Sequence, residues 1–190
     1  MSCLRKIEYR IEPTESYRIL RNCSGCGEKR SYVNTGNFRV NANGRRIDVW
    51  LIYQCEKCKH TYNLTIMERV RPEEIPEETY KKFLANDKEL AFQYGLDHML
   101  MNRNRAEIER DKITYHICRE EDCGDEIESL SGECVVVSNP YEVKVRADKL
   151  LAEIFEVSRS KVRQMEKEGE ISQLPKYVGK EMEVQCQKIN

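Results

Sequence analysis

The chain has few of the residues on which enzyme active sites and membrane spans usually depend. Only three of its 190 residues are histidine, and no Ser-His-Asp arrangement, glycine-rich phosphate loop or open metal site can be recognised. No apolar run approaches membrane-spanning length, and the first twenty residues alternate charged with apolar side chains instead of forming a signal-peptide core. We therefore expect a cytoplasmic protein that is not an enzyme.

Cysteine, by contrast, is frequent: the chain has nine. Four of them form two Cys-x-x-Cys pairs, Cys23 with Cys26 and Cys55 with Cys58. Two such pairs supply the four thiolates of a closed tetrahedral zinc site, so the spacing predicts a structural Zn²⁺ in a zinc ribbon. The alternative is four buried or disulfide-bonded cysteines, but an odd cysteine count fits a reducing compartment better than a disulfide framework. The cysteines that follow are poorly spaced for a second zinc site: Cys118, Cys123 and Cys134.

Three residues beside the cysteine pairs fit this interpretation. Gly25 and Gly27 suit the positive φ that the tight turn of a Cys-x-x-Cys pair often requires. His60 could be a spare ligand, but because four sulfurs already complete the site we expect it at the surface.

The residues between the two cysteine pairs read as a β-hairpin. Phe38 and Val40 alternate with polar residues, Asn43-Gly44 indicates a two-residue turn, and residues 47–53 form an apolar strand that leads into the second pair. A third strand follows at residues 62–66, and strands within residues 4–21, broken at proline, could join the same sheet. Trp50 and Tyr53 lie in the most apolar strand, and we expect both in the core. Residues 1–71 are thus predicted to form a zinc-ribbon β domain.

Charge is segregated along the chain although the net charge is only −1. Residues 21–71 carry ten Lys or Arg against four Asp or Glu, whereas residues 72–135 carry eight against seventeen. A basic segment beside an acidic one often marks a surface that binds a polyanion, although such charge runs are also common on solvated faces. Most of the acidic residues fall in residues 72–142, which we expect to form a helical connector. The predicted helices lie near residues 76–84, 87–95 and 97–109. Two predicted strands, at 113–117 and 133–138, flank an acidic loop.

The C-terminal residues 143–190 predict a pair of helices with a basic face. Leu150, Leu151, Ile154 and Phe155 form one apolar helical stripe, and Ser158 is placed to cap the next helix. In that second helix Arg159, Arg163 and Lys167 recur every four residues and so share a face. The capped N-terminus and these cations together favour a phosphate, and the alternative is a solvated helix face.

Two resemblances accompany these patterns. The Arg-x-Asp sequence at 146–148, the Ser-Arg-Ser turn at 158–160 and the glycine at 169 resemble the RNA-binding domain of small-subunit ribosomal protein four, which implies a helix pair followed by a short β-hairpin. The cysteine pairs with residues 39–44 and 48–55 resemble an uncharacterised bacterial family known as domain of unknown function one thousand and sixty-two, which implies no established activity. Basic residues and the resemblance together give the candidate RNA contacts: Arg146, Lys149, Ser158, Arg159, Ser160, Lys161, Arg163 and Lys167, with Arg39, Arg45 and Arg46 of the ribbon.

The sequence therefore predicts an α+β protein of three parts: a zinc ribbon, a helical connector and an RNA-binding-like module of a helix pair plus hairpin. We expect it to bind structured or ribosome-associated RNA, with Zn²⁺ in a purely structural role. The alternative is a zinc-stapled adaptor that binds a protein partner, or associates with itself, through the acidic middle segment.

Overall fold

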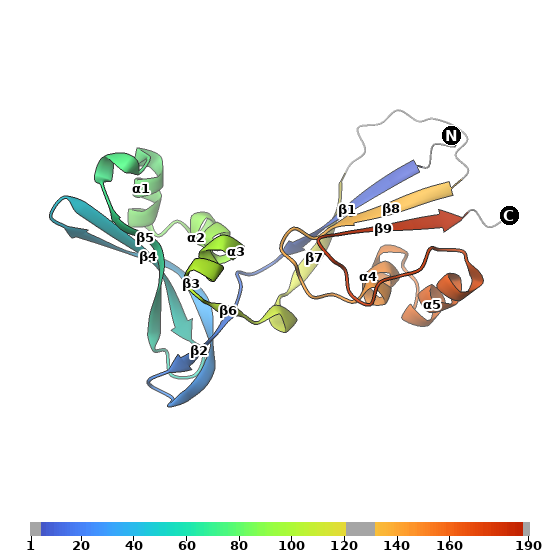
Figure 1. Cartoon of the computed structure of the whole chain (residues 1–190), viewed down its shortest axis with the longest axis horizontal. Helices are drawn as coiled ribbons and strands as arrows, with labels where there is room; N and C mark the ends of the chain where they lie inside the picture. Colours follow the sequence, from blue (N-terminus) through green and yellow to red (C-terminus); the bar gives the residue numbers. More distant parts are fainter. Residues whose placement is uncertain (1–4, 121–131, 188–190) are drawn as a thin grey trace. The chain divides into compact units, whose positions relative to one another are not determined.

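The computed structural model describes residues 5–120 and 132–187 and divides the chain into two compact units. One unit spans Glu15–Ile113, and the other combines the N-terminal residues up to Thr14 with those from Thr114 onward. Each unit contains one sheet and helices, so the fold is mixed α+β and rich in strand (Figure 1). These boundaries differ from the three consecutive segments expected from the sequence. The acidic loop expected between residues 117 and 133 lies largely outside the described residues.

The unit of residues 15–113 is built on a five-stranded antiparallel sheet of order β5-β4-β3-β2-β6. Its strands are β2 (Ile19–Cys23), β3 (Glu28–Asn43), β4 (Arg46–Cys55), β5 (Thr61–Val70) and β6 (Glu107–Ile108). The predicted hairpin and the strand after the second cysteine pair are thus present. The turn is displaced by one residue from the prediction, because Asn43 pairs with Arg46 and the two-residue loop is Gly44-Arg45. Gly44 has a φ of 63°, which a residue without Cβ adopts most easily.

Strand β4 lies between β3 and β5 in this sheet and buries alternate side chains. Val49, Leu51 and Tyr53 are fully buried, as the period of two in a strand requires. Tyr53 therefore lies in the core as expected. The same alternation places Trp50 on the opposite face, where it is only half-buried, so its expected place in the core is wrong.

Three helices follow β5 and pack within the same unit: α1 (Glu77–Ala85), α2 (Lys88–Gly95) and α3 (His98–Arg103), after a 3₁₀ turn at Pro72–Glu74. The ring of Phe83 lies 4.9 Å from that of Phe38 on β3 and 5.8 Å from that of Tyr94. Part of the expected connector therefore packs on the five-stranded sheet. Asp87 and Asp97 cap α2 and α3 with side-chain hydrogen bonds to backbone N–H groups.

Helix α3 is shorter than the predicted helix to residue 109. It ends where the Asn104 side chain turns to β5, accepting from Thr65 N at 2.9 Å and donating to Thr65 O at 2.9 Å. Arg105 then has a φ of 51°, which stops a right-handed helix. The residues beyond it form β6, which pairs with β2.

The second unit contains a four-stranded sheet of order β7-β1-β8-β9. Its strands are β1 (Arg5–Pro13), β7 (Tyr115–Arg119), β8 (Gly132–Ser138) and β9 (Glu181–Gln187). Strand β1 runs parallel to β8 and antiparallel to β7. The sequence suggested that this strand could join the five-stranded sheet, but it does not. Its partners, β7 and β8, come from the later part of the chain.

Helices α4 (Ala147–Ile154) and α5 (Arg159–Glu168) belong to this second unit and pack against each other (Figure 1). Leu150 and Leu151 of the predicted stripe are fully buried, as is Val162 on α5, whereas Ile154 and Phe155 are only half-buried. Ser158 caps α5 by accepting from Lys161 N at 3.2 Å, and Gly169 ends it with a φ of 76°. The expected short hairpin after Gly169 is replaced by an isolated bridge from Ile171 to Cys186 and by β9, which pairs with the distant β8. Among the described residues, no helix is long and apolar enough to cross a membrane.

Candidate metal centre and candidate nucleic-acid interface

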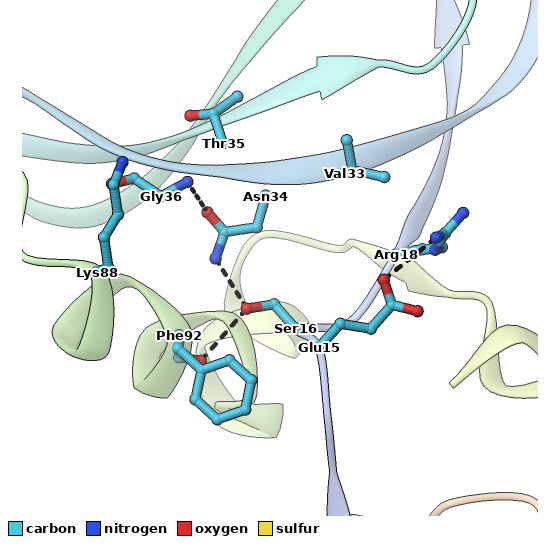
Figure 2. Close-up of a pocket in the computed structure, with 9 residues that line it drawn as sticks. All are labelled: Glu15, Ser16, Arg18, Val33, Asn34, Thr35, Gly36, Lys88 and Phe92. Atoms are coloured by element: carbon cyan, nitrogen blue, oxygen red, sulfur yellow. Dashed lines mark hydrogen bonds and ion pairs between the residues drawn. The ribbon is translucent and has the colours of Figure 1, made fainter. Parts of the chain in front are cut away.

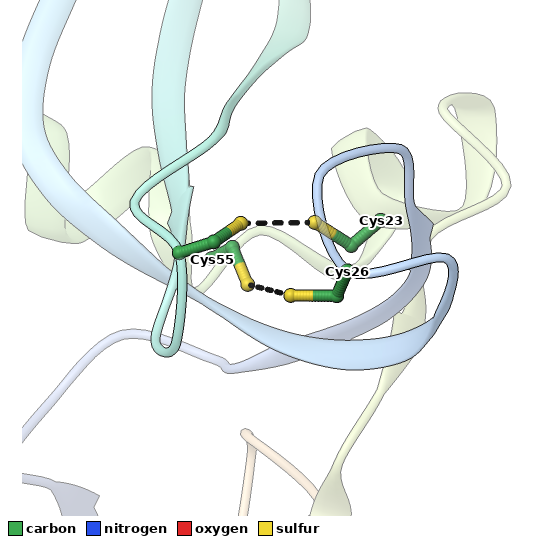
Figure 3. A group of neighbouring side chains, drawn as sticks. Cys23, Cys26 and Cys55 are labelled. Carbon is green, nitrogen blue, oxygen red and sulfur yellow. Dashed lines mark hydrogen bonds between the residues drawn. The ribbon is translucent and has the colours of Figure 1, made fainter.

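The structure brings the four predicted cysteine ligands together at one end of the five-stranded sheet. Their sulfur atoms all lie within 4.8 Å of one another, and Cys23 Sγ lies 3.3 Å from Cys58 Sγ. Cys26 and Cys55 point their sulfur atoms toward each other (Figure 3), and these atoms lie 3.9 Å apart. A tetrahedral ion with metal–sulfur bonds of about 2.3 Å separates neighbouring sulfurs by about 3.8 Å. The separations are too long for disulfides, whose sulfurs lie about 2.05 Å apart. The cluster is thus compatible with a metal site.

Each cysteine pair forms the same tight turn. Cys23 O accepts from Cys26 N at 3.2 Å and from Gly27 N at 2.8 Å, and Cys55 O accepts from Lys59 N at 3.1 Å. The residue that follows each pair has a positive φ, 72° at Gly27 and 64° at Lys59. Gly27 therefore has the conformation predicted for it.

Gly25 does not have the positive φ expected from the sequence, but glycine is needed there for another reason. A Cβ at Gly25 would lie 3.0 Å from Cys58 Sγ. That distance is tighter than ordinary van der Waals contact, so a side chain would press on the cluster. Gly25 thus makes room for the fourth sulfur.

The electrostatics of the cluster suit a cation. A hydrogen bond with the Tyr32 side chain lowers the pKa of Cys23 to about 6, and backbone hydrogen bonds from Cys58 and Lys57 lower that of Cys55. Burial and the neighbouring sulfurs raise the pKa of Cys26 to about 12. Four adjacent thiolates repel one another, and a divalent cation removes that cost by binding all of them.

His60 lies beside the cluster but is engaged elsewhere. Its Nε2 is 3.0 Å from Ser24 Oγ, and its side chain is exposed. This agrees with the surface position predicted for it.

The cysteines outside the cluster have other partners. Cys134 is buried, and its thiol donates to Glu183 at 3.2 Å. Cys118 lies near His116 and Glu12, the latter across the β1–β7 pair, with Glu12 Oε2 3.4 Å from His116 Nε2 and 3.7 Å from Cys118 Sγ. These ligand atoms are close enough to hold an ion, although the histidine and the carboxylate also contact each other at an exposed position. Cys123 is outside the described residues.

Three of the predicted RNA-binding residues converge on one carboxylate, that of Asp148 in the first turn of α4. Arg146 donates to both of its oxygens, at 2.9 and 3.1 Å. Arg159 donates to Oδ2 at 2.9 Å, and Arg163 donates to the same oxygen at 2.8 and 3.1 Å. We call Arg146, Arg159 and Arg163 the arginine cluster. One buried negative charge thus orients three guanidinium groups.

Asp148 was not among the predicted site residues. In the structure it is buried, with only 8% of its surface exposed. The hydrogen bond from Arg146, then those from Arg159 and Arg163, hold the pKa of Asp148 well below its usual range. It is therefore ionised at neutral pH. The arginine side chains themselves remain 41–59% exposed, so their outer N–H groups face solvent.

A cavity of about 310 Å³ adjoins this arrangement. Arg146, Asp148 and Arg163 line it on the helix side, and Pro175 and Lys176 line it on the side of the segment after α5. Glu166 also lines it, and its Oε1 accepts from Leu174 N at 2.8 Å. Lys176 was not among the predicted contacts, because no helical period places it beside the arginines.

The other predicted contacts lie apart from the arginine cluster. The Nζ atom of Lys149 lies 5.6 Å from the ring centroid of Tyr115, and that of Lys161 lies 3.9 Å from Glu170. Ser160 and Lys167 are exposed on α5. The ribbon arginines belong to the other unit: Arg39 on β3, Arg45 in the turn and Arg46 on β4, where its guanidinium donates to Arg69 O at 3.1 Å.

A further pocket, of about 280 Å³, lies in the first unit beside an irregularity in β3 (Figure 2). Its polar side chains bond to one another or to the bulged backbone. Asn34 donates to Ser16 Oγ at 2.9 Å and accepts from Gly36 N at 2.8 Å, while Lys88 donates to Gly36 O at 3.0 Å. These contacts secure the bulge, and we assign no ligand to the pocket.

Comparison with known proteins places these features in a family. The model of the family described as protein of unknown function (DUF1062) matches residues 40–176. The chain belongs to the DUF1062 family. The DUF1062 match contains the second cysteine pair, Asp148 and the whole arginine cluster, while the first cysteine pair precedes it. No curated protein and no solved structure matches the chain.

Proposed function

We propose that the protein binds RNA through the arginine cluster of α4 and α5 and that the four cysteines hold a structural Zn²⁺. The observation that carries the first part is the convergence of Arg146, Arg159 and Arg163 on the single carboxylate of Asp148. Three positive charges against one leave an excess of two at this point.

This excess suits a phosphate diester. Guanidinium groups present planar forks of N–H donors, and each arginine of the cluster retains exposed donors while Asp148 fixes its position. Such preorganisation lowers the conformational entropy lost when a ligand binds. The N-terminus of α5, which begins at Arg159, adds a positive dipole end beside the guanidiniums. The resemblance of this segment to the RNA-binding domain of small-subunit ribosomal protein four favours RNA as the polyanion.

Zinc is the ion that best fits four cysteines. Thiolates prefer soft or borderline metals, and four of them in tight turns are typical of structural zinc. Because four sulfurs complete the tetrahedron, no position is left for a substrate. The ion would stabilise the turns at the end of the five-stranded sheet.

The test of RNA binding is a salt series. The zinc-loaded protein is titrated with total cellular RNA, and the slope of log affinity against log salt concentration is measured. RNA binding predicts a steep negative slope, and on single-stranded RNA a variant should flatten it by about 0.7 for each phosphate that it no longer neutralises. The variant is Arg159→Gln with Arg163→Gln, because reversal to glutamate would place two carboxylates against Asp148 and disturb the fold.

The matched control removes the same charge from the other unit. Lys81 and Lys82 are exposed on α1, and the double variant Lys81→Gln with Lys82→Gln should bind RNA as the wild type does. Equal losses in both variants would mean that net charge alone drives binding, which would contradict the proposed site. Absence of RNA binding at low salt, together with salt-independent capture of a protein, would favour the adaptor function instead.

A further inference from the structure

Tyr177 presents an exposed aromatic ring next to the arginine cluster. It is 40% exposed and is one of three large apolar or aromatic side chains exposed to this degree among the described residues. It follows α5 in the segment 171–180, which was not predicted to take part in binding. A tyrosine in the core would be explained by packing, whereas this ring is available to a ligand.

The backbone holds Tyr177 firmly against the start of α4. Tyr177 forms an antiparallel bridge with Arg146, and its neighbours complete the pairing. Val178 N donates to Val145 O at 3.0 Å, and Ala147 N donates to Lys176 O at 3.4 Å. Residues directly opposite in such a bridge have Cβ atoms about 5 Å apart. The ring is therefore fixed beside the first arginine of the cluster.

Two lysine side chains place their cations over the ring. The Nζ atoms of Lys144 and Lys176 lie 5.7 and 5.5 Å from its centroid. Lys176 also lines the cavity that Arg146 and Arg163 line. Lys176 thus links the aromatic ring to a cavity in which three cations outnumber the carboxylates of Asp148 and Glu166.

We propose that Tyr177 is a stacking platform for an unpaired base of the bound RNA, whose neighbouring phosphate lies in the cavity lined by Arg146, Arg163 and Lys176. This inference rests on the proposed function and specifies the RNA: a loop, bulge or single strand in which one base is free to stack. Proteins commonly recognise RNA at such positions, because unpaired bases expose faces that a duplex hides. Lysine side chains are flexible, so those over the ring can move to the phosphates when the base arrives.

The experiment uses the full-length zinc-loaded protein and two probes, a short fluorescein-labelled oligoadenylate and the same oligomer with abasic residues throughout. Base–aromatic stacking contributes about 1–3 kcal/mol per base, which corresponds to roughly 5- to 150-fold in affinity. Tyr177→Leu keeps an apolar side chain but lacks the aromatic face, so it should weaken oligoadenylate binding by that factor without changing the salt slope. Tyr177→Phe should bind as the wild type does. The abasic oligomer should bind the wild type and Tyr177→Leu equally.

The matched control is Tyr62→Leu, because Tyr62 also carries a cation over its ring, with Arg21 3.5 Å from the centroid, but lies in the other unit. It should leave oligoadenylate affinity unchanged. Normal affinity of Tyr177→Leu beside weakened binding by Arg163→Gln would refute the stacking platform and leave the RNA site intact. Failure of both probes and of total cellular RNA to bind the wild-type protein would refute the proposed function itself.

Discussion

Replacement of Asp148 by asparagine tests whether one buried carboxylate organises the arginine cluster. Asparagine keeps the shape of the side chain but removes its charge and turns one acceptor oxygen into an NH₂ donor. In the wild type Arg146 uses both oxygens, and Arg159 and Arg163 share Oδ2. In the variant at least one arginine would face a donor instead of an acceptor, and three cations would remain without their counter-ion.

The magnitude follows from burial. A hydrogen bond to a charged group contributes about 1.5–3 kcal/mol when its partners are shielded from water. Here Asp148 is buried but the arginines are 41–59% exposed, so water compensates most of what they lose. We expect a net loss of about 2 kcal/mol in the free energy of unfolding. For a domain of 60–100 residues this lowers Tm by roughly 8–16 °C.

The assay is thermal unfolding followed by circular dichroism, with Glu168→Gln as the control. Glu168 lies exposed on α5, and its carboxylate accepts from Gln164 at 2.8 Å. Its substitution changes the net charge equally but should alter Tm by little. If the Asp148→Asn and Glu168→Gln proteins melt together, Asp148 does not stabilise the helix pair and the reasoning from its contacts is wrong.

The same contacts predict a pH dependence. Because the pKa of Asp148 is lowered in the folded state, its ionised form stabilises the fold above the unfolded-state pKa of about 3.9. That stabilisation is lost as the pH falls below about 4 and through the lowered pKa. The difference in unfolding free energy between wild type and Asp148→Asn should therefore be constant near neutral pH and shrink in acid. A difference that grew as the pH fell would have the wrong sign for this mechanism.

Two further predictions concern the unit of residues 15–113. Cys55→Ser should abolish zinc binding by the four cysteines, measured as zinc per protein, and should lower Tm. The control His116→Ala should leave that zinc in place. A Cys55→Ser protein that keeps its zinc would rule out the four-sulfur site. Gly95→Ala should cost about 1–3 kcal/mol of unfolding free energy, because its Cβ would collide with Ser16 Oγ and would lie 2.7 Å from Asn34 Nδ2. Gly179→Ala, where the nearest atom would be 3.6 Å away, is the control in denaturant unfolding, and equal midpoints for the two would contradict the close packing at Gly95.

Local patterns in the sequence were sufficient to predict those features of the fold that depend on residues close together in the chain. The cysteine spacing with its hairpin predicted the sulfur cluster, because strands β3 and β4 meet through a two-residue loop. The predicted cap at Ser158 marked the start of α5, since a capping side chain bonds to N–H groups only two or three residues ahead.

Pairings between distant segments could not be predicted in this way. Strand β1 lies between β7 and β8, although both of these strands come more than one hundred residues after it in the chain. Its alternating pattern says that it is a strand but not which strand it joins, because hydrophobic alternation specifies a face and not a partner. The same limit explains why the residues of β6 were expected in a helix and why no pairing of β9 with β8 was predicted.

Asp148 shows how this limit affects the candidate site. Its position in the sequence suggests a carboxylate in the first turn of a helix, where it interacts favourably with the helix dipole. The four-residue period of α5 suggests that Arg159, Arg163 and Lys167 lie on one solvated face. The packing of α4 on α5 brings the two patterns together, so that Arg159 and Arg163 reach a residue on another helix. The same packing leaves Arg146 opposite Tyr177, which no helical period connects to it. The proposed anion site thus depends on the contact between two helices and the segment after them, and substitutions that loosen α4 against α5 should weaken binding even where every arginine is retained.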